Sequence, residues 1–145
     1  MILQLTPNTH PILHEKMKPC SEDLDRREMS RILKENMIHY EGVGLSANQI
    51  GISERVFVMI LHMETEEIIT CFNPRIIKKY NEDVWFEEGC LSFPDEIINI
   101  QRPNRIVVKY EDEDKKDHKI KLDGLAARVF LHEFDHLEGI VFTER

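Results

Sequence analysis

The segment GLAARVFLHEFDHLEG, residues 124–139, decides the fold. Apolar residues and two histidines recur in it at spacings of three and four, which predicts a helix with one continuous face. Its H-E-x-x-H motif places His132 and His136 one turn apart on that face, where both imidazoles can reach a single metal ion. Glu133 lies beside the pair, where a carboxylate can take a proton from a metal-activated water. A solvated or core-facing histidine pair also fits the motif, so further ligands are needed to decide.

The N-terminal third predicts another helix, near residues 22–41. Ser21 is a suitable N-cap, acidic residues in the first turn suit the helix dipole, and apolar residues follow at helical spacing until Gly42. Between the two helices, β-branched and aromatic residues predict strands, broken once by Asn73-Pro74. The predicted strands are residues 55–61, 67–72, 75–80, 105–110 and 117–122, the last two joined as a hairpin by an acidic loop. This order predicts an α+β fold with antiparallel or mixed sheets around the central metal-binding H-E-x-x-H helix.

Length and composition limit the classes of protein. The 145 residues, without repeats or a linker, predict a single catalytic domain over 1–145. A formal net charge of −8 argues against nucleic acid as a main partner. The longest apolar run, residues 56–61, is too short to cross a membrane, and the N-terminus lacks the pattern of a signal peptide, so we expect no membrane partner and a cytoplasmic location. Three widely spaced cysteines indicate no disulfide framework.

A third metal ligand is expected from EGCLS, residues 88–92. A catalytic metal centre of this type has three protein ligands and an open position. The thiolate of Cys90 is the best candidate, and Gly89 lets its backbone approach the ion without a Cβ. A buried structural thiol is the simpler interpretation of this cysteine, and the carboxylates of Glu88 and Asp123 are rival ligands, as in many metalloproteases.

The segment EGVGLSANQ, residues 41–49, has two glycines directly after the first predicted helix. A dinucleotide-binding loop would follow a strand and carry a third glycine, so that interpretation is disfavoured. A wall of small residues beside a substrate fits better, with Gln49 as a neutral amide donor. A helix C-cap at Gly42 is the simpler alternative.

These three segments, in this order, resemble the motifs of the peptide deformylase family, which are G-x-G-L-A-A-x-Q, E-G-C-L-S and Q-H-E-x-D-H-L-x-G. The resemblance covers nearly the whole chain. It implies that Cys90, His132 and His136 hold the metal and that Glu133 is the catalytic acid/base. It also implies that Gln49 and the backbone N–H of Leu91 polarise the formyl oxygen of the substrate.

The resemblance implies removal of the formyl group from the N-terminal N-formylmethionine of nascent polypeptides, with release of formate. Metal-bound hydroxide would attack the formyl carbon while Glu133 takes its proton. Family members typically use one Fe²⁺ ion, which Ni²⁺, Co²⁺ or Zn²⁺ can replace. The expected partners are therefore N-formylmethionyl peptides and nascent chains.

Methionine specificity predicts an apolar pocket near the metal. Its expected walls lie beside the motifs and on the ligand-bearing helix face: Val43, Gly44, Phe86, Gly89, Leu125 and Val129. Each of the apolar ones could equally be core. The backbone near the two glycines can pair with an extended peptide as an added strand. Arg102 is expected at the surface, or alternatively beside a peptide carbonyl.

The chain departs from the family motifs at two positions. Ser46 stands in place of the first alanine, and Leu131 stands in place of the glutamine before the first histidine. Neither is a ligand or the base, so we expect both to tune the surroundings of the site. Longer bacterial members continue into a C-terminal helix implicated in ribosome docking, whereas this sequence ends at Arg145 and resembles shortened forms that include virus-encoded members. Ribosome association through such a helix is therefore not predicted.

Two other functions fit parts of the sequence. A zinc-dependent endopeptidase would use the same H-E-x-x-H motif with a carboxylate or a third histidine as ligand, and would cleave internal peptide bonds. A non-catalytic binding protein would keep the metal for structure, but such a site needs neither the acid/base Glu133 nor the amide donor Gln49.

Overall fold

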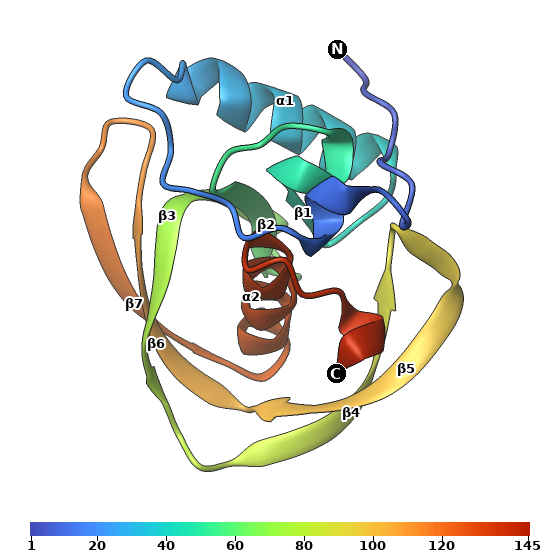
Figure 1. Ribbon diagram of the computed structural model, residues 1–145. Coiled ribbons are helices and arrows are strands. Elements are labelled where there is room, and N and C mark those ends of the chain that lie inside the picture. Colours follow the sequence, from blue (N-terminus) through green and yellow to red (C-terminus); the bar gives the residue numbers. More distant parts are fainter.

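The structure, a computed structural model, describes residues 1–145 and consists of two α-helices, two sheets and three short 3-10 helices (Figure 1). The α-helices are α1 (Arg26–His39) and α2 (Gly124–Leu137). The larger sheet has the order β1-β2-β3-β6-β7, with β1 (Gly44–Ser46), β2 (Val56–His62), β3 (Glu67–Lys79), β6 (Arg105–Glu111) and β7 (Asp117–Asp123). The smaller sheet pairs β4 (Asp83–Cys90) with β5 (Phe93–Pro103). The 3-10 helices are η1 (Pro11–His14), η2 (Ala47–Ile50) and η3 (Phe142–Glu144).

Helix α2 lies at the centre of the molecule, with the large sheet and the β4–β5 hairpin around it (Figure 1). Ten of its 14 residues are buried. Phe130 packs edge to face on Phe57 of β2, with the ring centroids 5.1 Å apart. Because the same helix carries the core residues and the H-E-x-x-H motif, burial of its apolar face fixes the direction in which the two histidines point.

All strand pairs are antiparallel, which agrees with the predicted α+β fold. The predicted hairpin is confirmed: β6 and β7 pair from Arg105 opposite Asp123 to Glu111 opposite Asp117. The predicted break at Asn73-Pro74 is wrong, because β3 continues through it. The register with β6 shifts between Phe72 and Arg75, and Asn73 adopts a φ of 49°, so a bulge accommodates the proline.

Helix α1 begins later than predicted. Its N-cap is Asp25, whose carboxylate accepts a hydrogen bond from the backbone N–H of Glu28. Ser21 is therefore not the cap, and its hydroxyl donates instead to Glu54 at 2.6 Å. Beyond the other end of the helix, Glu41 rather than Gly42 takes the left-handed conformation, with a φ of 57°. Gly42 still takes part in the C-terminal cap, because its backbone N–H donates to the carbonyl of Met37 at 3.0 Å.

The β4–β5 hairpin, which supplies Cys90, was not predicted from the sequence. Its large apolar residues Trp85, Phe86 and Ile97 are exposed, at 60, 57 and 73%. A hairpin that leaves such residues exposed shows no clean alternation of apolar and polar positions, which is the pattern that identifies a strand.

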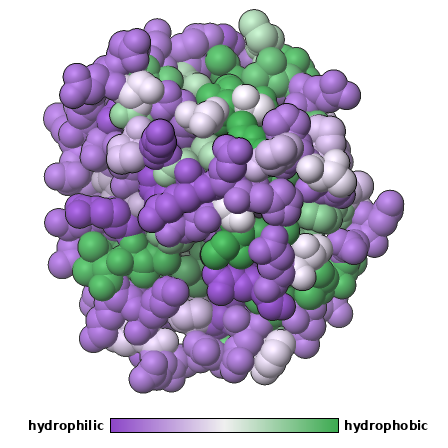
Figure 2. All heavy atoms as spheres, in the orientation of Figure 1, coloured by the Kyte–Doolittle hydropathy of each residue, from purple (hydrophilic) through white to green (hydrophobic).

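Figure 2 shows that the visible face of the molecule is largely hydrophilic, with hydrophobic side chains in scattered groups. The chain has no helix with the length and apolarity needed to span a membrane.

Candidate active site

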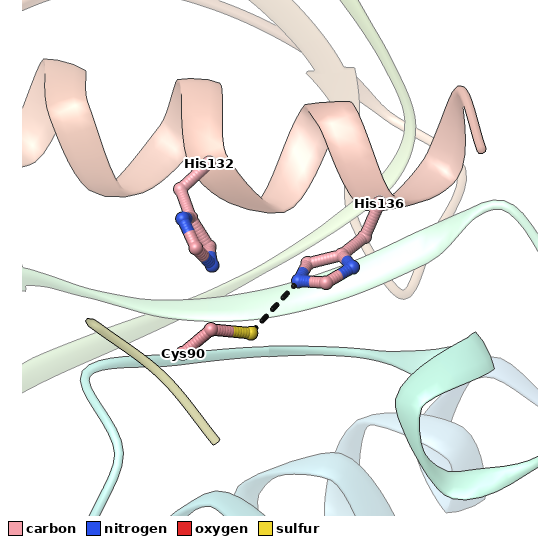
Figure 3. Close-up of side chains that lie close together, drawn as sticks. All are labelled: Cys90, His132 and His136. Carbon is pink, nitrogen blue, oxygen red and sulfur yellow. Dashed lines mark hydrogen bonds between the residues drawn. The ribbon is translucent and has the colours of Figure 1, made fainter. Parts of the chain in front are cut away.

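The predicted metal ligands Cys90, His132 and His136 lie together. Their ligand atoms are all within 4.8 Å of one another, and Sγ of Cys90 is 3.4 Å from Nε2 of His136. Figure 3 shows the two imidazoles extending from one helix toward the thiol, which comes from a separate segment. The cluster therefore joins α2 to the end of β4.

The donor set fits a divalent transition metal. Sulfur and nitrogen ligands at about 2.3 and 2.1 Å from a tetrahedral ion would lie about 3.6 Å apart, close to the observed separation of Cys90 and His136. The rival carboxylates do not join the cluster: Asp123 is exposed at the N-cap of α2, and Glu88 bonds to the far nitrogen of His132. Among the three candidate ligands that the sequence allows, the geometry favours the thiol of Cys90.

Glu88 orients the first histidine from behind. Its Oε1 lies 2.9 Å from Nδ1 of His132, so the opposite nitrogen faces the cluster. Burial alone would raise the pKa of Glu88, but hydrogen bonds from His132 and Arg102 and the nearby guanidinium charge lower it to about 2. The carboxylate is thus ionised at all physiological pH values, and it fixes which nitrogen of His132 is available to a metal.

Arg102 supports Glu88 from within the protein. Its side chain is 4% exposed and donates to Glu88 at 2.5 and 3.0 Å and to Asp135 at 2.8 Å. Both the surface position and the contact with a peptide carbonyl that were considered for Arg102 are therefore wrong. Arg128 also donates to Glu88, at 2.6 Å. Arg128 and Asp135 were not predicted as site residues. A sequence signal did exist for Arg128, because it lies four residues before His132 and so on the same helical face.

Glu133 is a buried carboxylate with few protein groups to stabilise its charge. Its Oε1 has no hydrogen bond from the protein, and burial raises the pKa of Glu133 to about 7. Gly44 of β1 lies directly against it, since a Cβ added there would be 2.6 Å from Oε2. The second glycine of the G-x-G segment thus allows β1 to approach the carboxylate. A buried, unpartnered acid with a pKa near neutrality is typical of a proton-transfer site.

Gln49 lies next to Cys90. Its amide nitrogen is 3.1 Å from the hydroxyl of Ser92 and 3.6 Å from Sγ of Cys90. Gly42, the first glycine of the G-x-G segment, leaves room for the side chain of Leu91, because a Cβ on Gly42 would be 2.8 Å from a methyl carbon of Leu91. Gln49 and Leu91, which were predicted to polarise a substrate oxygen, both line the same pocket. The contact of Ser92 with Gln49 was not predicted from the sequence.

A pocket of about 450 Å³ opens beside these residues. All six predicted substrate-binding residues line it, together with Gln49, Leu91 and Glu133. Of these residues, Val129 is buried, whereas Leu125 is about half exposed. A Cβ added at Gly89 would meet no protein atom within 4 Å, so the protein itself does not require glycine there. Of the two departures from the family motifs, Leu131 is a core residue and Ser46 is buried near the site.

Comparison with known proteins identifies the family. The family model for polypeptide deformylase matches residues 2–145. The chain belongs to the polypeptide deformylase family. A peptide deformylase of Thermotoga maritima is 42% identical over 136 residues, which cover 93% of this chain and 81% of the relative.

Solved structures of deformylases share the fold. The crystal structure from Thermotoga maritima matches with a TM-score of 0.93 and 38% identity, over 100% of this chain and 97% of the other. A probable peptide deformylase from Synechococcus phage S-SSM7 matches with a TM-score of 0.89 and 40% identity, over 98% of both chains. The predicted α+β fold is thereby confirmed, and the chain is a peptide deformylase, an enzyme that deformylates nascent chains. The endopeptidase and binding-protein alternatives are set aside.

Proposed function

We propose that this deformylase hydrolyses the N-formyl group of N-formylmethionyl peptides with one divalent ion held by Cys90, His132 and His136, and with Glu133 as general acid/base. The observation that carries the proposal is the position of Glu133. Its carboxylate is buried, has an oxygen without a protein hydrogen bond, and lies on the same helix as the two histidine ligands.

The ion would supply Lewis-acid chemistry, by lowering the pKa of a water molecule and by polarising the formyl oxygen. Family members are metalloenzymes, and the Cys90–His132–His136 cluster is the candidate site for the metal. A thiolate with two imidazoles suits Fe²⁺, Co²⁺, Ni²⁺ and Zn²⁺. We propose Fe²⁺ as the native ion, which the other three can replace, and expect oxygen sensitivity of the ferrous form because the thiolate can be oxidised.

Glu133 would move one proton through the reaction. It accepts the proton of the water that attacks the formyl carbon, and it returns that proton to the amine nitrogen as the formyl C–N bond breaks. The products are a free N-terminal amine and formic acid, which keeps the second proton of the water until it ionises to formate. A pKa of about 7 suits both steps, since the carboxylate is then neither too weak a base nor too weak an acid at neutral pH.

Negative charge develops on the formyl oxygen during the attack. The amide N–H of Gln49 and the backbone N–H of Leu91 would donate to it, as neutral groups that need no reorganisation. In support, Gln49 already directs its amide nitrogen toward Cys90, with 3.6 Å between the nitrogen and the sulfur. Loss of one such donor typically lowers the rate about a hundredfold.

The 450 Å³ pocket would receive the methionine side chain. Its apolar walls Val43, Phe86, Leu125 and Val129 suit the low polarity of a thioether side chain. Gly44 on β1 and Gly89 on β4 lie on strands that border the pocket, and the backbone near them would pair with an extended peptide. This arrangement would place the formyl group at the metal end of the pocket.

The proposal is tested with protein loaded anaerobically with Fe²⁺ or Ni²⁺ and given a formyl-Met tripeptide. We expect loss of the formyl group and equimolar formate, with no cleavage of an acetyl-Met tripeptide of the same sequence. Cys90→Ser should lose the metal, as measured by metal analysis after desalting. Internal peptide cleavage, or no formate from fully metallated protein, would contradict the proposal.

A further inference from the structure

Ser46 is the departure from the family motif that lies nearest the site. It ends β1, directly before the 3-10 helix η2 that carries Asn48 and Gln49. All three side chains are buried, with exposed fractions of 0, 0 and 1%. Their polar atoms therefore have to be satisfied by one another and by nearby backbone groups.

The oxygen end of the Gln49 carboxamide faces Ser46. Both the backbone N–H and the hydroxyl of Ser46 lie 3.0 Å from Oε1 of Gln49. If the carboxamide turned over, its NH₂ group would face the backbone N–H of Ser46, which can only donate, and the hydroxyl would have to turn its hydrogen away. Its amide nitrogen therefore points the other way, toward the hydroxyl of Ser92 and the thiol of Cys90.

Asn48 connects the same hydroxyl to the metal-binding helix. Its amide nitrogen donates to the backbone carbonyl of His136 at 2.7 Å, and its Oδ1 lies 2.7 Å from Oγ of Ser46. A serine hydroxyl has one hydrogen. That hydrogen is therefore shared between the amide oxygens of Asn48 and Gln49.

We propose that the Ser46 hydroxyl is a positioning group, which holds the Gln49 carboxamide with its N–H end directed at the substrate's formyl oxygen. Through Asn48, the same hydroxyl ties this donor to the helix that carries both histidine ligands. The inference rests on the proposed role of Gln49 in the reaction. Ser46 itself touches neither substrate nor metal, and alanine, the family's residue at this position, removes its hydroxyl without adding volume.

Steady-state kinetics of four proteins test the inference: the parent, Ser46→Ala, Gln49→Ala and the double variant. We expect Ser46→Ala to lower kcat about fivefold with KM unchanged, the size expected for loss of one buried hydrogen bond. In the Gln49→Ala background the same change should leave kcat unaltered, because the group that it positions is gone. Ser30→Ala is the matched control, since Ser30 is another buried serine but bonds to Thr70, away from the site.

A second measurement follows the carboxamide directly in protein loaded with Zn²⁺, which is diamagnetic and allows NMR. Hydrogen exchange of the Gln49 side-chain amide, measured by NMR, should be at least about tenfold faster in Ser46→Ala than in the parent or in Ser30→Ala. If Ser46→Ala does not fold, Ser46→Gly takes its place in both experiments.

An equal loss of kcat in both backgrounds, no loss in either, or unchanged amide exchange would overturn the inference and leave the proposed function intact. A parent-like kcat in Gln49→Ala would instead contradict the proposed role of Gln49, and the inference would fall with it.

Discussion

The chemistry proposed here depends on a carboxylate that the protein leaves without a partner. Glu133 is buried between α2 and β1, and no protein group donates to its Oε1. Such a group lowers stability and is retained where its proton affinity is used. Its position depends on Gly44, which leaves no room for a side chain. The sequence predicted both residues as site residues, but their mutual contact depends on packing and could not be predicted.

Gly44→Ala tests this contact at the residue scale. The added methyl would overlap Glu133, so the carboxylate has to move, and we expect kcat to fall about tenfold or more. Gly89→Ala is the control, because it adds a methyl to the same pocket without meeting a protein atom, and should change KM more than kcat. A Gly44→Ala variant with the parent's kcat would show that the contact does not position Glu133.

At the scale of elements, the site is assembled from the β4–β5 hairpin and helix α2. The helix was predicted because its apolar period is strong, whereas the hairpin was missed because much of its apolar surface stays exposed. Buried ion pairs hold the two together: Glu88 of β4 and Arg102 of β5 meet Arg128 and Asp135 of α2. The sequence showed these charges but gave no sign that they were buried, because partners distant in sequence have no local pattern.

Glu88→Gln tests the connection between the hairpin and the helix. It leaves two buried guanidinium groups short of a counter-charge, and we expect the free energy of unfolding of the metal-free protein to fall by about 3–5 kcal/mol in urea at pH 7. Glu87→Gln, an exposed neighbour on the same strand, should change it by less than about 0.5 kcal/mol. Equal stabilities for the two variants would refute a structural role for the ion pairs.

We also expect the loss of stability in Glu88→Gln to depend on pH. The pKa of Glu88 is lowered from its ordinary value of 4.5 to about 2, so its ionised form stabilises the folded state. That contribution is complete above pH 4.5 and is lost as the pH falls through about 2. The difference in stability between the parent and Glu88→Gln should therefore shrink across this range, as measured by urea titrations at several pH values. A constant difference would contradict the assignment.

At the scale of the whole molecule, an ion held by Cys90, His132 and His136 would connect the β4–β5 hairpin to α2, and through α2 to the large sheet. The α+β fold class followed from the order of predicted elements, and the motifs predicted the ligands. The arrangement of two separate sheets did not follow, because strand pairing depends on contacts between distant segments.

A metal ion that binds only the folded state stabilises it by mass action. At a free-ion concentration of a hundred times Kd, the free energy of unfolding rises by about 2.7 kcal/mol.

Metal removal should therefore lower Tm. For a chain of this length, that stabilisation corresponds to about 8 °C, which we expect to lose when a chelator is added to protein in excess Ni²⁺. In Cys90→Ser the chelator should have little effect, because the third ligand is missing. An equal shift in both proteins would show that the metal binds elsewhere.

The most direct test of the account compares formate release by the parent and by Glu133→Gln, both loaded with Ni²⁺ to the same measured content. Glutamine keeps the size of the side chain but cannot accept the proton. The account predicts rapid release by the parent and a fall in kcat of about a hundredfold or more in the variant. Comparable release by the two proteins would contradict the assignment of Glu133 as the acid/base.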